Sequence, residues 1–112
     1  MAETLRSDGK AVEITLTELT TKGTPVRVDG FMGILMASGS SGDIVAIEIA
    51  QRVHEMTVGV GVTAAKGDIL YIAEDGTVDN TNTERAFCKI VRAKDSNNIV
   101  WGLLLPQGAE SV

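Results

Sequence analysis

The sequence is poor in residues that stiffen a small fold, with a single cysteine and 4% aromatic residues in 112 positions. One cysteine cannot form an internal disulfide, so packing alone must hold the fold, and synthesis in a cytoplasm is the simpler expectation. Valine, isoleucine, leucine and alanine must fill the core, and a hydrophobic content of 44% is enough for this. The length allows one domain with one modest core.

Positive charge is also scarce, because 10 Lys and Arg residues face 15 Asp and Glu residues, a net charge of -5. Nucleic acids and anionic membranes attract clustered Lys and Arg, so the composition argues against both as partners. No apolar run approaches the length of a membrane span. The polar start, residues 1–4, has no hydrophobic region of a signal peptide, so we expect no such leader.

Three stretches share one pattern, in which a glycine precedes Thr or Asp and apolar residues then occupy every second position. They are residues 23–28, 42–47 and 67–72. Glycine reaches the positive φ of a tight turn, and alternation of apolar and polar residues is typical of a half-buried strand. Their spacing along the chain is unequal, which indicates a recurring turn and strand rather than a solenoid repeat.

The rest of the chain follows the same alternation, and no stretch has a convincing helical period. Turns are expected at Asp29-Gly30, in the loop 38–42, at residues 74–77 and in the polar loop 79–83, with a bend at 59–62. Further strands are expected at residues 11–19, 31–36, 44–50, 52–58, 86–93 and 99–105. The prediction is an all-β fold, a small single-domain barrel or sandwich of about eight short strands. It would cover residues 11–106, between a flexible arm at 1–10 and a short tail at 107–112.

Two stretches resemble nucleotide-binding motifs, but neither has the neighbouring residues or structure that such a motif requires. Residues 59–64 match the glycine spacing of dinucleotide-binding loops, but that motif needs a helix directly after it, and a strand is expected instead. Residues 61–66 resemble part of a phosphate-binding loop, but Lys66 comes before Gly67, which is the reverse of the order in that loop. No Ser or Thr follows the Lys to hold magnesium. We therefore expect no enzyme activity, no catalytic residues and no cofactor.

His54 and Cys88 are the only histidine and cysteine of the chain. Catalysis would require the two to meet with an orienting group, and one of each is too few for a structural zinc centre. We expect a packed thiol, a surface imidazole and no metal site. The large apolar residues Phe31, Met32 and Trp101 are open to two interpretations, as core or as a subunit interface, in which Trp and Met are enriched.

In the order of its motifs the chain resembles the phage capsid decoration, or cement, proteins, some of which have been labelled as predicted recombinases. The resemblance extends over about residues 11–105 and is carried by residues 22–26, 30–34, 41–45, 65–71, 75–76 and 99–103. It implies a non-enzymatic virion protein, made in the host cytoplasm, that binds the outside of an assembled head. Such proteins typically form trimers at three-fold positions and bridge capsomers of the major capsid protein.

The candidate interface residues are Leu5, Phe31, Met32 and Trp101. Leu5 belongs to the arm, which we expect to order on the capsid by adding a strand to an exposed sheet edge. The alternative function is a small-molecule-binding or carrier β-barrel, which would act as a monomer and hold its ligand in a pocket. A nucleic-acid-binding barrel would need a basic groove with stacking aromatics, which the composition does not favour.

Overall fold

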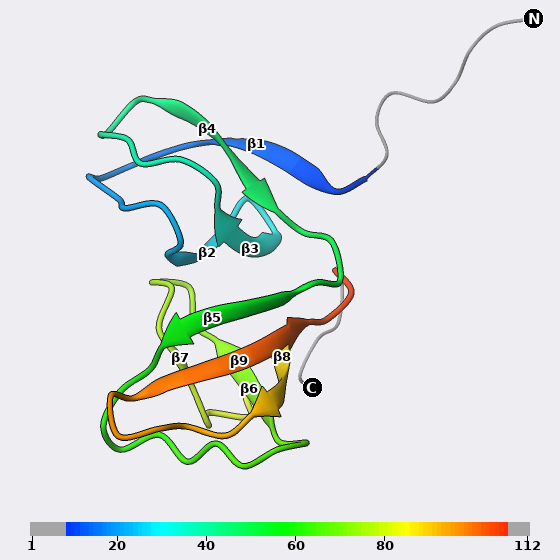
Figure 1. The fold of residues 1–112 in the computed structure, drawn as a ribbon. Helices are drawn as coiled ribbons and strands as arrows, with labels where there is room; N and C mark the ends of the chain where they lie inside the picture. Colours follow the sequence, from blue (N-terminus) through cyan, green and yellow to red (C-terminus); the bar gives the residue numbers. More distant parts are fainter. Residues whose placement is uncertain (1–8, 108–112) are drawn as a thin grey trace, which may run out of the picture.

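The structure, a computed structural model, describes residues 9–107 and arranges them as nine β-strands in two antiparallel sheets (Figure 1). No residue of this range is helical, so the all-β prediction is confirmed. The predicted arm falls mostly, and the tail largely, outside the described residues. The division into arm, domain and tail therefore stays a prediction.

The first half of the chain forms a four-stranded sheet in the order β1-β4-β3-β2. Its strands are β1 (Ala11–Thr15), β2 (Pro25–Val28), β3 (Phe31–Leu35) and β4 (Ile44–Glu48). The turn between β2 and β3 is the predicted two-residue one, because Asp29 and Gly30 both have positive φ, 54° and 84°. The predicted strand 11–19 ends earlier, at Thr15, although Leu16 keeps a backbone hydrogen bond to Asp43.

The second half forms a five-stranded sheet in the order β5-β9-β8-β6-β7. Its strands are β5 (Val53–Thr57), β6 (Ile69–Ile72), β7 (Val78–Asp79), β8 (Arg85–Arg92) and β9 (Ile99–Leu104). The tight turn predicted at residues 74–77 joins β6 to β7, and the Thr77 N–H donates to Oδ1 of Asp75 there. That hydrogen bond lowers the pKa of the Asp75 carboxyl. The strand β7 was missed, because its two residues begin a stretch that is otherwise polar.

The core is divided between two clusters, where the length had suggested one. The smaller cluster belongs to the four-stranded sheet and includes Ile14, Leu35 and Ile47. The larger cluster belongs to the five-stranded sheet, yet it also contains Met32 and Ile34 of β3. Beyond the exposed Phe31, strand β3 is therefore buried on both of its faces, with Met32 and Ile34 in the larger cluster and Leu35 in the smaller one.

Candidate functional site

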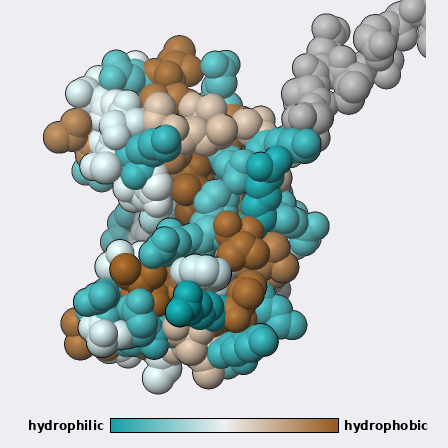
Figure 2. Space-filling view, in the orientation of Figure 1, coloured by the Kyte–Doolittle hydropathy of each residue, from teal (hydrophilic) through white to brown (hydrophobic). Residues whose placement is uncertain are grey.

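The outer face of the five-stranded sheet carries apolar side chains on both sides of the exposed Lys89. Along β9 the residues Val100, Gly102 and Leu104 are buried, whereas Trp101 and Leu103 alternate with them toward the outside. The register places Val53, Leu103, Lys89 and Ile69 side by side across four strands. Figure 2 shows hydrophobic side chains on this face, over the start of β5 and the end of β9, with hydrophilic residues around them. We call Val53, Leu103, Ile69 and Trp101 the outer apolar patch.

Trp101 lies in the outer apolar patch with 39% of its surface exposed. The guanidinium carbon of Arg92 is 4.8 Å from the centre of its indole ring, a cation–π contact. The contact arises because a bulge in β8 places Arg92 opposite Trp101. Arg92 therefore covers part of the indole ring, and the exposed remainder of Trp101 is available to a partner.

The other predicted interface residues do not join this patch. Met32 is 1% exposed and packs in the larger core cluster, so the structure supports its interpretation as core rather than interface. Phe31 is 38% exposed but belongs to β3 of the other sheet. Leu5 lies outside the described residues. Phe31 and Trp101 are thus exposed positions on two different sheets.

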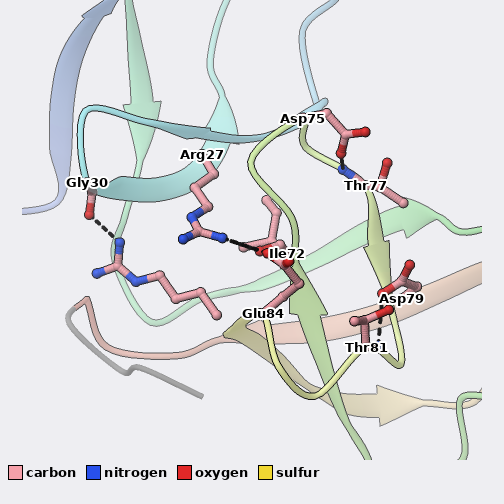
Figure 3. A network of polar contacts seen from close by, with 9 residues as sticks. Arg27, Gly30, Ile72, Asp75, Thr77, Asp79, Thr81 and Glu84 are labelled. Atoms are coloured by element: carbon pink, nitrogen blue, oxygen red, sulfur yellow. Dashed lines mark hydrogen bonds and ion pairs between the residues drawn. The ribbon is translucent and has the colours of Figure 1, made fainter. Parts of the chain in front are cut away.

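Three polar side chains fasten the two sheets together. Arg27 of β2 donates through Nη1 to the carbonyl oxygen of Ile72 and to Oε2 of Glu84, each at 3.0 Å (Figure 3). Gln107 accepts from the Met32 N–H at 2.9 Å and donates to the Met32 carbonyl at 2.7 Å. Arg85 of β8 donates to the carbonyl of Gly30 in the β2–β3 turn. Each of these contacts joins the β2–β3 hairpin, which carries Met32, to the second half of the chain.

His54 is not the surface imidazole that the sequence predicted. Its side chain is 22% exposed, and Nε2 lies 2.7 Å from Oε1 of Glu48, across the seam between β4 and β5. The two groups are within salt-bridge distance, although Nε2 makes no hydrogen bond of regular geometry. Nε of Arg52 is 3.8 Å from the same carboxylate. The contacts of His54 and Arg52 with Glu48 therefore connect the two sheets at the point where the chain passes from one to the other.

Cys88 is the packed thiol that was predicted, with none of its surface exposed. Burial raises the pKa of the thiol from 9.0 to about 12, and a hydrogen bond with the Leu70 backbone offsets this only in part. A protonated, covered thiol is neither a nucleophile nor a metal ligand at neutral pH. Within residues 9–107 no group of three or more His, Cys, Asp or Glu side chains could hold a metal ion.

The glycine-rich stretch 59–64 has no helix after it, as predicted, and the chain turns at Lys66-Gly67 into β6. Lys94 donates from Nζ to the carbonyl oxygens of Val60 and Val62. Two carbonyl groups of this loop are therefore already bound by a cation of the protein itself. The surface pockets lie along the loops and the junction of the sheets, and side chains such as Phe87 and Leu70 fill the interior. The described residues include no helix that could cross a membrane.

Comparison with known proteins gives matches of two different kinds. The family model described as phage cement protein matches residues 6–102. Among solved structures, the chain is similar to the head fiber gp8.5 N base of bacteriophage phi29, with a TM-score of 0.50 and 12% identity. The match covers 85% of this chain and 92% of that chain, and at such low identity it shows a shared fold alone. No curated protein sequence matches.

Proposed function

The chain belongs to the phage cement protein family, and we propose that it is a non-enzymatic decoration protein on the outer surface of an assembled phage head. The family match over residues 6–102 is the observation that carries this proposal. Membership gives the protein a structural role in a phage head. The finer statement, that it binds the major capsid protein and stabilises the shell by bridging capsomers, is the part that needs testing.

Co-sedimentation with purified heads is the direct test. The full-length protein should pellet with intact heads in a saturable way and stay in solution with disassembled capsid protein, because bridging requires neighbouring capsomers. Decorated heads should also release their genome at a higher temperature than bare heads. Equal binding to separate capsid subunits would contradict the bridging proposal, and absence of binding to any head preparation would contradict the decoration role.

We further propose that the protein assembles as a homotrimer through Phe31 and the outer apolar patch. A cyclic trimer has heterologous interfaces, in which each protomer presents two different surfaces. The placement of Phe31 and Trp101 on different sheets fits this requirement, since one could meet the other on the neighbouring protomer. A small domain without disulfides also gains stability from covering exposed apolar side chains.

Light scattering on size-separated protein tests the trimer. Trp101→Ser and Phe31→Ser should each lower the mass toward that of a monomer. Val60→Ser is the matched control, because Val60 is 81% exposed on a loop outside the patch, and it should leave the mass unchanged. A monomeric wild type at high concentration would contradict assembly in solution. If the wild type and the three variants all had the same mass, neither Phe31 nor Trp101 would belong to the interface.

The arm, residues 1–10, remains a proposal, since residues 1–8, including Leu5, lie outside the described residues. It cannot bury enough apolar surface to order alone, but an extended segment can add a strand to a sheet edge. We propose that it orders on the capsid with Leu5 in a pocket. A chain that starts at Lys10 should keep its unfolding midpoint and bind heads more weakly. Unchanged head binding would contradict this role.

A further inference from the structure

Arg85 differs from the other charged residues that the structure describes, because it alone is buried, with 7% of its surface exposed. It begins β8, next to the β2–β3 turn of the other sheet. One of its terminal nitrogens, Nη1, donates to the carbonyl of Gly30. Its Nε is buried and has no hydrogen-bond partner.

The unused part of this guanidinium is the edge that oxyanions bind. Nε–H and Nη2–H point in the same direction and form the fork that a carboxylate or phosphate accepts with two oxygens. Neither nitrogen has a hydrogen bond to a described residue, and no carboxylate of the described chain pairs with Arg85. A buried cation without a counter-ion is costly, so such a group in a native protein calls for a missing partner.

Arg27 provides the internal comparison. It lies on the same pocket, but its Nη1 is 3.0 Å from the carboxylate of Glu84 and also donates to the Ile72 carbonyl (Figure 3). The more exposed of the two arginines, at 22% for its side chain, therefore has its counter-ion, and the more buried one does not. Shortage of acidic residues is not the reason, because the chain is acidic overall.

A surface pocket of about 430 Å³ connects Arg85 to solvent, and Arg27, Asp29, Gly30 and Glu74 form the rest of its wall. We propose that this pocket binds an oxyanion group, carboxylate or phosphate, through the Nε–Nη2 fork of Arg85. Nε is buried in the free protein, so we expect binding to be accompanied by a movement of the pocket wall that uncovers it. Asp29 and Glu74 line the same pocket, and their negative charges oppose the binding of an anion there.

The first experiment measures thermal unfolding of the full-length chain in sodium phosphate, in sodium acetate and in sodium chloride at equal ionic strength. Specific binding raises the unfolding midpoint in a saturable way. We expect this rise with phosphate or acetate and its loss in Arg85→Lys, which keeps the charge but lacks the fork. Arg52→Lys, on the exposed surface, should keep the rise. An equal rise in Arg85→Lys, or no rise beyond chloride, would overturn the proposal.

A spectroscopic measurement keeps the test valid if Arg85→Lys does not fold. In the ¹⁵N-labelled wild type, phosphate should shift the Nε–H resonance of Arg85 and leave that of Arg52 in place. Glu74→Gln removes a repelling charge from the wall and should move the saturation to lower phosphate concentration. An unmoved Arg85 resonance, or weaker binding by Glu74→Gln, would place the anion elsewhere and overturn the proposal.

The source of the oxyanion is decided by a separate experiment, the only one that rests on the proposed function. If the group is an acidic side chain of the head, acetate should reduce co-sedimentation of the wild type more than chloride does, and Arg85→Lys should bind heads weakly. If acetate leaves head binding unchanged while the midpoint still rises, the ligand is a free anion. Failure of head binding as a whole leaves the unfolding result intact, so the two proposals fail separately.

Discussion

Replacing Gly33 by alanine should be among the most damaging single changes to this fold. A Cβ atom at this position of β3 would lie 2.3 Å from the carbonyl oxygen of Glu48 and 3.1 Å from its carbonyl carbon. A carbon–oxygen contact needs about 3.3 Å, so β3 and β4 would have to separate by about 1 Å. Both neighbouring atoms belong to the backbone and cannot rotate away.

The expected cost follows from the two effects of that separation. A backbone hydrogen bond stretched by about 1 Å passes out of bonding range, and each one lost costs about 0.5–1.5 kcal/mol. Overpacking of the seam adds about 1–3 kcal/mol. Together they predict a loss of about 2–4 kcal/mol, a large share of the roughly 5–15 kcal/mol available to a domain of this size. The unfolding temperature should fall by about 10–25 °C.

Urea unfolding followed by the fluorescence of Trp101, the only tryptophan, measures this loss. Two other glycines separate the steric effect from the backbone effect. Gly61→Ala meets no atom within 4 Å at an ordinary φ and should be neutral or slightly stabilising. Gly42→Ala also meets open space but has a φ of 91°, so it should cost about 1 kcal/mol. A Gly33→Ala protein within about 0.5 kcal/mol of the wild type would refute the close approach of β3 and β4.

Gln107→Ala should cost about 1–3 kcal/mol in urea unfolding, because it leaves the N–H and carbonyl of Met32 without partners; a neutral result would mean that the clamp is not formed. The thiol of Cys88 has its pKa raised from 9.0 to about 12, so the folded state holds its proton more tightly and stability should fall as pH rises from 9 toward 12. The slope from this group approaches about 1.4 kcal/mol per pH unit, and Cys88→Ala should remove that part of the pH dependence. Cys88→Ala and His54→Gln should both leave head binding intact, and loss of binding by a folded variant would give that residue a role.

Much of the fold follows from local patterns in the sequence. Alternating apolar residues predicted the strands, and Asp29-Gly30 predicted the two-residue turn, because Asp and Gly tolerate the positive φ that it requires. The packed state of Cys88 was predicted because a lone cysteine in a small β domain is most often a packed thiol. The errors at the end of β1 and in β7 occur where few residues carry the pattern, so neighbouring contacts decide whether the chain pairs.

The functional surfaces were less accessible to sequence reasoning. Met32 and Phe31 are neighbours in one apolar run, yet only Phe31 is exposed, because the second sheet covers the other side of β3. The surface position of Trp101 depends on the register of β9 with its neighbours, and its contact with Arg92 depends on a bulge. Nothing in the sequence indicated that Arg85 is buried, since a strand that begins with arginine usually starts at the surface.

Strand content, turns and the residues that share a face of each strand can be predicted from the sequence, because they depend on backbone sterics and on a period of two residues. Which faces are covered depends on contacts between residues far apart in the chain, so it is known only from the folded structure. The docking of the β2–β3 hairpin on the five-stranded sheet divides the core, buries Met32 and encloses the guanidinium of Arg85. These contacts join residues 32 and 107 and residues 30 and 85, separations that no local pattern encodes.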